Sequence, residues 1–319
     1  MKRIDDRPTL VLGGTGHFGR YIVASLLAKN KPVRVLSRTP EKARILLGNR
    51  PEIIQGDITS RESLFPALDN IRAIVISVSA MSWQLIRKLE LIERDSILML
   101  LEEAQSRGIS RVVYISAYDI VEDIVSQLPR LFQTIPRIKQ EVETALSQSQ
   151  FNWTVLGAPP SMKIFFAMIR GDRMMVPGGG PPALPTVSAQ DVGEIAAQSV
   201  LRDDLSGRRI RMPGPEALSF PEAARRISAV WKKEITFRKI PLLPLQIASL
   251  VTLPFNPFLR HLAGSVKLLN LFPQDIAREA DRDHRFLREI FSYTPVTLEV
   301  EAARRNLAQK SEAINDHAE

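Results

Sequence analysis

The first half of the chain alternates short apolar runs with stretches of helical periodicity. The apolar runs predict strands at residues 9–12, 33–36, 52–54, 72–78, 111–115 and 153–156. Between them, apolar residues recur every three or four positions and predict helices at 18–29, 41–47, 60–68, 90–106 and 136–149. Strands that alternate with helices form parallel sheets with helices on both faces. The predicted fold class is therefore α/β, with a doubly wound parallel sheet of the Rossmann type.

The pattern changes after Gly157, where prolines and glycines interrupt the apolar runs. Helices are predicted at 189–201 and 219–231, a strand at 208–212, and a charged surface helix after about residue 299. Asp191 fits an N-cap or first-turn position of its helix. We divide the chain into a Rossmann domain at 1–157 and a smaller, mostly helical substrate or partner domain at 158–319, some elements of which return to the sheet.

Residues 240–259 are uncharged and largely apolar, but prolines at positions 241, 244, 254 and 257 interrupt them. No run of about 18 apolar residues remains, so a transmembrane span is not predicted. The segment is interpreted as the lid of a substrate pocket or as an interfacial segment. A peripheral membrane or partner contact through 240–272, aided by Arg260 and Lys267, stays open as an alternative.

Composition narrows the function classes. The chain has 319 residues, no cysteine, and four histidines without metal-ligand spacing, which argues against disulfides, thiolate chemistry and a zinc site. The net charge of +8 comes from scattered residues rather than from a basic run with interleaved aromatics, so nucleic acid is not the expected partner. The short, charged N-terminus has no secretory signal pattern, and a cytoplasmic location is expected. The oligomeric state is not indicated.

The segment between the first strand and the first helix carries the main motif, GGTGHFGR, at residues 13–20. In a strand–loop–helix context, Gly13 permits a tight turn, Gly16 lets the backbone approach a pyrophosphate, and Gly19 allows close packing. The free N–H groups at the helix start favour an anion. Together with Thr15, His17 and Phe18, these glycines are the predicted phosphate-binding loop of a dinucleotide.

The end of the second strand indicates which dinucleotide is bound. An acidic residue there would bind the ribose hydroxyls of NAD, but the sequence has Ser37 and Arg38. The guanidinium of Arg38 suits a 2′-phosphate, and Arg20 and Lys42 are candidates to lie close by. NADP(H) is therefore the predicted cofactor.

These residues resemble the atypical short-chain dehydrogenase/reductases, and especially their NmrA-like branch. The resemblance covers about residues 8–235 and includes VRVLSR, Gly56-Asp57, Ser77-Val78-Ser79, RGISRVVYISA, Lys139 with Glu143, WTVL and SAQDVGEIAA. It implies that Asp57 and Ile58 flank the adenine and that Ser77 and Ser79 line the cofactor groove. It further implies that Ser116 and Lys139 lie near the nicotinamide ribose.

One departure from the family pattern concerns catalysis. Catalytic members of the wider superfamily carry a tyrosine acid four residues before the lysine, where this chain has Ile135. Tyr118, just past a strand end, is the alternative candidate, and Tyr114 fits a packing position. The predicted catalytic residues are Lys139, Tyr118 and Ser116. A second departure is Gly157-Ala158-Pro159-Pro160, where related proteins often have Arg-Pro, and it leaves the substrate class open.

Three functions are compatible with these motifs. We favour an NADPH-dependent reductase of a small apolar carbonyl, enone or quinone, because delocalised charge in enones and quinones reduces the need for a tyrosine acid. The alternative is a non-catalytic redox sensor or assembly protein that binds NADP(H) and a regulatory partner. A sugar-nucleotide epimerase or dehydratase ranks last, because it depends on the absent tyrosine. Whether the protein is an enzyme is not decided by the sequence.

Overall fold

A seven-stranded sheet forms the centre of the protein. The computed structural model describes residues 6–118, 125–272 and 275–316. The strands follow the order β10-β6-β5-β4-β1-β2-β3, and all neighbours are parallel. Their bounds are β1 Thr9–Leu12, β2 Val33–Ser37, β3 Glu52–Gln55, β4 Ala73–Ile76, β5 Arg111–Ala117, β6 Asn152–Ala158 and β10 Arg208–Arg211. The strand order reverses between β1 and β4, which is where doubly wound folds bind their ligands. The predicted fold class is confirmed.

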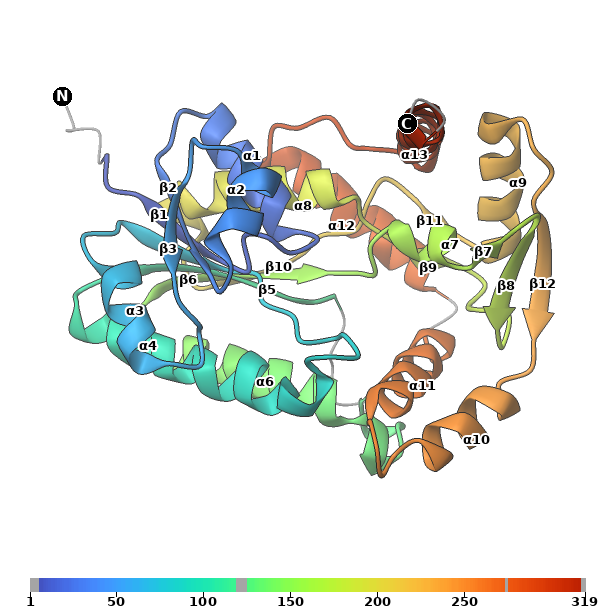
Figure 1. The fold of residues 1–319 in the computed structure, drawn as a ribbon, viewed down its shortest axis with the longest axis horizontal. Helices are drawn as coiled ribbons and strands as arrows, with labels where there is room; N and C mark the ends of the chain where they lie inside the picture. The colour runs from blue at the N-terminus through green and yellow to red at the C-terminus, as the bar shows by residue number, and fades with distance from the viewer. Residues whose placement is uncertain (1–5, 119–124, 273–274, 317–319) are drawn as a thin grey trace.

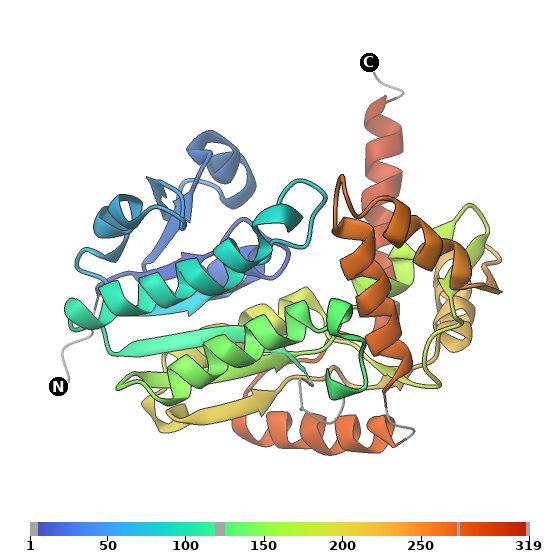
Figure 2. The ribbon, with the colours of Figure 1, turned by 90° about the horizontal axis from the view of Figure 1, so that it is seen from below.

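Helices cover both faces of this sheet (Figure 1). One face carries α1 Gly19–Ala28, α2 Pro40–Leu47, α8 Ala189–Val200 and α12 Ile276–Ile290, and the other carries α3 Arg61–Leu68, α4 Ser96–Ser106 and α6 Thr134–Ser147. Strand β1 has apolar side chains on both faces of the sheet. Leu10 and Leu12 pack in the core beneath α3, α4 and α6, whereas Val11 packs in the core beneath α1 and α8. Successive strand side chains point to opposite faces, so an all-apolar strand serves two cores. In Figure 2, α4 and α6 lie along the underside of the sheet.

The second half of the chain contributes both to the sheet and to a separate lobe. Strand β10 and helix α8 belong to the sheet layers. Ser188, rather than Asp191, is the N-cap of α8, since its hydroxyl accepts the Asp191 N–H at 2.9 Å. The Asp191 carboxylate instead accepts the Val296 N–H. Burial raises the pKa of Asp191 to about 6, although the Val296 bond opposes the shift.

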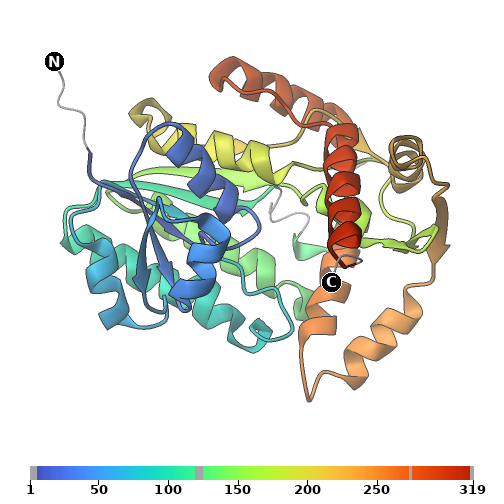
Figure 3. The same cartoon turned by 45° about the horizontal axis from the view of Figure 1, so that its top comes forward.

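The C-terminal lobe has its own core and two small sheets that the sequence pattern did not predict. Strand order is β12-β8-β7 in one sheet and β11-β9 in the other. The strands are β7 Ile169–Arg170, β8 Arg173–Pro177, β9 Leu184–Pro185, β11 Ala217–Leu218 and β12 Thr236–Ile240. The helices are α7 Lys163–Ala167, α9 Phe220–Trp231, α10 Leu243–Val251, α11 Phe258–Asn270 and α13 Leu298–Asp316. Seen with the top of the molecule forward, α13 crosses in front of this lobe (Figure 3).

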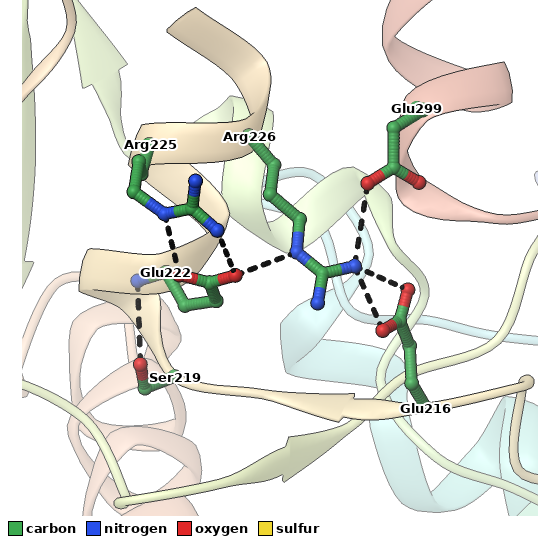
Figure 4. A network of polar contacts seen from close by, with 6 residues as sticks. All are labelled: Glu216, Ser219, Glu222, Arg225, Arg226 and Glu299. Atoms are coloured by element: carbon green, nitrogen blue, oxygen red, sulfur yellow. Dashed lines mark hydrogen bonds and ion pairs between the residues drawn. The ribbon is translucent and has the colours of Figure 1, made fainter. Parts of the chain in front are cut away.

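A network of ion pairs and hydrogen bonds connects α9 with α13 (Figure 4). Arg226 on α9 donates to Glu216 and Glu222, at 2.8 and 2.7 Å, and to Glu299 on α13 at 3.3 Å. The Ser219 hydroxyl caps α9 by accepting the Glu222 N–H, as expected for the capped helix predicted at 219–231. One guanidinium therefore joins three segments of the lobe.

Candidate functional site

A cavity of about 980 Å³ opens at the carboxyl ends of the sheet strands. Except for Gly19, every residue predicted to bind the cofactor or to take part in catalysis lines it. The cavity passes from the glycine loop and Arg38, across the ends of β4 and β5, to side chains of α11. Residues far apart in the sequence therefore meet at the strand-order reversal.

Steric limits explain the glycines of the loop. Gly13 has φ +73°, and a Cβ there would lie 2.2 Å from the Ser77 carbonyl oxygen. A Cβ on Gly19 would lie 2.0 Å from the Gly13 carbonyl oxygen, so Gly19 packs behind the loop rather than in the cavity wall. A Cβ on Gly16 would sit 3.0 Å from that same oxygen. The loop is thus a narrow backbone cradle at the start of α1, which fits a pyrophosphate.

Arg38 follows β2 and is exposed at the rim of the cavity, with Lys42 on the neighbouring helix. Arg20, the other cation considered from the sequence, is absent from the cavity lining, and its guanidinium stacks on the Tyr21 ring at 5.0 Å. The rim therefore presents two cations where an adenosine 2′-phosphate would require them.

Polar groups between the loop and the adenine side are held by local bonds. The Asp57 carboxylate accepts the N–H and hydroxyl of Thr59, both at 2.9 Å, which fixes the turn after β3. The Ser77 N–H donates to the Leu12 carbonyl, and the Ser79 hydroxyl accepts the Met81 N–H at 3.4 Å. Ile58 lines the same wall.

Lys139 is buried rather than solvated, with 9% of its surface exposed. Its ammonium donates to the Glu93 carboxylate at 2.8 Å and lies 5.3 Å from the centre of the Tyr114 ring. Burial opposes the charged form, but Tyr114 and Glu93 more than offset this, and the pKa of Lys139 is raised above its ordinary value. Lys139 is therefore a fixed positive charge in the cavity wall.

Glu93 is the main residue that the sequence analysis missed. The helix predicted at 90–106 is present, and it contains a π-helical turn, η2 Leu91–Asp95, directly before α4. This turn directs Glu93, only 2% exposed, into the cavity wall, where it also accepts the Ala80 N–H at 2.6 Å. Single π-turns within helices are frequent at functional sites. No sequence signal marked it, because an acidic residue in a helix is usually solvated.

Ser116 and Tyr118 also have partners within the protein. The Ser116 hydroxyl donates to Glu143 at 2.5 Å, and Glu143 in turn accepts from Arg209 on β10 at 2.8 Å. The Tyr118 hydroxyl donates to Asp283 on α12 at 2.9 Å. Tyr118 thus borders the cavity while its hydroxyl is directed to the C-terminal segment.

His17 connects the glycine loop with the second half of the chain. Its Nε2 lies 2.7 Å from the Ser161 hydroxyl, next to Pro159 and Pro160 in the cavity wall. Burial, reinforced by the nearby charges of Lys163, Arg20 and Arg305, lowers the pKa of His17 to about 4. The imidazole is therefore neutral at pH 7 and acts as a structural bridge.

The far end of the cavity is apolar. Side chains from residues 81–92, from Ile135, from α7 and from α11 with the residues just after it line this end, and they include Met81, Leu85, Ile92, Ile164, Leu268, Leu269 and Phe272. Ile135 occupies the position where related catalytic proteins have a tyrosine, so it adds to this apolar surface. Within residues 6–118, 125–272 and 275–316, we find no cluster of three or more His, Asp or Glu suited to a metal ion.

Comparison with known proteins agrees with this geometry. A protein-family model described as NAD(P)H-binding matches residues 13–203, which is more than half of the chain. A reductase from Streptomyces griseus, named (4-alkanoyl-5-oxo-2,5-dihydrofuran-3-yl)methyl phosphate reductase, is 27% identical over 236 residues, covering 72% of this chain and 76% of that protein.

Two further matches extend the comparison. The photosystem II assembly factor Ycf39 of Trieres chinensis is 30% identical over 148 residues, covering 46% of this chain and 43% of that protein. The structure of Citrobacter sp. triphenylmethane reductase complexed with NADP(H) has a TM-score of 0.71 and 15% identity, and covers 94% of this chain and 99% of that chain. The resemblance noted from the glycine loop is confirmed. Because the family model matches more than half of the chain, the chain belongs to the NAD(P)H-binding family.

Proposed function

We propose that the protein is an NADP(H)-dependent reductase of a small apolar carbonyl, enone or quinone. The observation that carries this proposal is a single cavity with a phosphate-binding loop and two cations at one end and an apolar wall at the other. Ligand sites of this kind are mostly apolar with a few placed polar groups. Relatives named as reductases, among them the NAD(P)H azoreductase of Xenophilus azovorans at 23% identity, support it.

The chain's own residues divide the work of binding. The backbone at Gly13–Gly16 would hold the pyrophosphate, Arg38 and Lys42 the 2′-phosphate, and Asp57 with Ile58 the adenine side. Lys139 would contact the nicotinamide ribose. When bound, NADPH supplies a hydride, and the apolar wall would hold an apolar acceptor beside it.

Lys139 suits charge stabilisation better than proton donation. Its raised pKa keeps the ammonium protonated at neutral pH, so it favours negative charge that develops on a substrate oxygen. Because the Tyr118 hydroxyl donates to Asp283, we propose that solvent delivers the proton after hydride transfer. Hydride transfer followed by protonation from solvent suits enones and quinones, because the negative charge that develops on them is delocalised.

The deciding experiment is a titration of the purified protein with NADPH and NADH, followed by NADPH oxidation against carbonyls, enones and quinones. Tighter NADPH binding with turnover of an apolar acceptor is the expected result. Failure to bind either nucleotide would contradict the cofactor assignment, and binding without oxidation of any acceptor would contradict catalysis.

A second candidate is a non-catalytic NADP(H)-binding regulatory or assembly protein. The observation that favours it is that Ser116, Tyr118 and Lys139 all have protein partners, while Ile135 replaces the usual acid. The relatives named as photosystem II assembly factors support it too. This function predicts tight nucleotide binding, no turnover, and a protein partner that co-purifies only when the nucleotide is present.

A further inference from the structure

Helix α10 presents its apolar side chains outward. Leu243, Ile247, Leu250 and Val251 fall on one helical face, and they are 53–65% exposed. The opposite side carries Ser249, which is 3% exposed. Helix α10 packs chiefly on α11 at the lower right of Figure 1. A surface helix normally buries its apolar stripe, so this reversed arrangement indicates a surface that meets something apolar.

Two more large side chains extend this face. Phe255, four residues past α10, is 73% exposed, and Trp83 is 53% exposed. Asn256 ties them together, because its side-chain amide donates to the Trp83 carbonyl at 3.0 Å. The Trp83 ring also lies edge-on to Phe258 at 5.8 Å. We call these six residues the α10 surface: Trp83, Leu243, Ile247, Leu250, Val251 and Phe255.

The segments around the α10 surface carry positive charge only. Residues 81–89, 125–138 and 241–272 contain no Asp or Glu. Their cations are Arg87, Lys88, Arg130, Arg137, Arg260 and Lys267. The short helix η3 Arg130–Phe132 packs against α11, and the Lys267 ammonium lies 5.4 Å from the centre of the Phe132 ring. The first acidic residue beyond Lys88, Glu90, is already paired with Arg94.

This combination of an apolar face and basic flanking segments favours a lipid surface as the partner. Protein interfaces use polar side chains around an apolar centre to form hydrogen bonds, whereas the exposed face of α10 offers aliphatic side chains alone. An apolar face bordered by Lys and Arg, with a tryptophan at its margin, matches the boundary between acyl chains and anionic headgroups. We propose that the protein docks on an anionic lipid bilayer through the α10 surface, without spanning the bilayer.

Helix α11 lies between the cavity and α10, and this position indicates how the protein would be oriented on a bilayer. Ser265, Leu268 and Leu269 of α11 line the apolar end of the cavity, while α10 covers the same helix from outside. Docking therefore brings the apolar end of the cavity next to the bilayer. Among the described residues, we find no helix both long and apolar enough to cross a membrane.

The test is co-sedimentation of the full chain with vesicles of phosphatidylcholine alone or of phosphatidylcholine with one third phosphatidylglycerol. We expect at least about tenfold stronger binding to the anionic vesicles, weakened by high salt. Tryptophan emission shifts to shorter wavelength on binding, and Trp83→Phe abolishes the shift.

Matched variants locate the contact. Leu250→Asp with Val251→Asp should reduce vesicle binding at least about tenfold. Ile45→Asp, at an 87% exposed residue of α2, should leave it unchanged. None of these three residues lines the cavity, so NADPH affinity measured in parallel reports folding and keeps this test separate from the proposed function. Equal binding to both vesicle types, equal loss in both variants, or no vesicle binding at all would each overturn the proposal.

Discussion

The two ends of the cavity differ in how their polar groups are used. At the nucleotide end, loop backbone and the exposed Arg38 and Lys42 face the cavity. Around Ser116 and Lys139, where we propose that the nicotinamide lies and which we call the nicotinamide end, the Ser116 hydroxyl and the Lys139 ammonium are paired with Glu143 and Glu93. The nucleotide end is therefore arranged to receive an anion, whereas the other end is already internally satisfied.

This difference separates binding from chemistry. A buried group that already bonds a protein partner has less hydrogen-bonding capacity left for a ligand than an open group, and loss of its partner leaves it unsatisfied. Specific nucleotide affinity is thus expected to depend on single residues at the loop and rim. Changes at the nicotinamide end are expected to affect stability first.

The largest expected effect lies at the internally satisfied end. Glu93→Ala leaves the buried Lys139 ammonium without its carboxylate and should lower the free energy of unfolding by about 3–5 kcal/mol. Urea denaturation measures this. The control is Glu102→Ala, which removes a 71% exposed partner of Arg61 and should cost at most about 1 kcal/mol. Equal losses in the two variants would show that the buried pair does not support the fold.

At the nucleotide end, Gly16→Val should raise the Kd for NADPH more than about a hundredfold, or about 2.7 kcal/mol. The added side chain would occupy the space that the pyrophosphate needs next to the Gly13 carbonyl. Calorimetric titration gives the Kd, and the thermal midpoint of the nucleotide-free protein checks the fold. Retained affinity in a folded variant would remove the phosphate-loop assignment.

Arg38→Ala tests the rim. Loss of a charge-assisted bond to the 2′-phosphate should weaken NADPH binding by about 1.5–3 kcal/mol, while NADH affinity changes by no more than about twofold. Arg20→Ala, which removes a cation outside the cavity lining, is the matched control. If NADH affinity falls as much as NADPH affinity, Arg38 does not read the 2′-phosphate.

Tyr118→Phe removes the hydroxyl bound to Asp283 and should cost about 1 kcal/mol of stability. Because the hydroxyl is bound to Asp283, we expect kcat of any reduction to stay within about twofold. Denaturation and steady-state rates are measured on the same preparation. A large fall in kcat with unchanged stability would instead make Tyr118 the proton donor.

The smallest effect concerns His17, which connects the glycine loop with Ser161. Its folded-state pKa of about 4 lies below the ordinary 6.5, so its contribution to stability is present above pH 6.5 and is lost as pH falls toward 4. NMR titration of the imidazole should give a midpoint near 4, with NADPH affinity unaffected by this group from pH 6 to 8. A midpoint near 6.5 would mean that the His17 ring is not buried among positive charges as described.

The nucleotide end was predictable from sequence because its determinants are local. The positive φ of Gly13 and the short distance from Gly16 to the Gly13 carbonyl arise within the loop itself, and Arg38 follows directly from the strand before it. The strand at 208–212 and the capped helix at 219–231 were likewise marked by local patterns. The cytoplasmic location and the domain boundary at residue 157 remain predictions.

The nicotinamide end depends on contacts between distant segments. Nothing near Glu93 in the sequence indicates Lys139, and nothing near Tyr118 indicates Asp283 on α12. The π-helical turn that orients Glu93 has no residue signature of its own. The two small sheets of the lobe were not predicted, because their strands are only two to five residues long and show little hydrophobic periodicity.

The late arrival of β10 has a consequence for synthesis on the ribosome. Strand β6 gains its outer neighbour only when residues 208–211 emerge, and α8, which packs against α1 and the sheet, emerges shortly before. A nascent chain that has reached residue 157 exposes an open strand edge and an uncovered apolar face, both of which promote aggregation. The Rossmann sheet is therefore completed by segments that follow residue 157. We expect a fragment that ends at Gly157 to fold poorly.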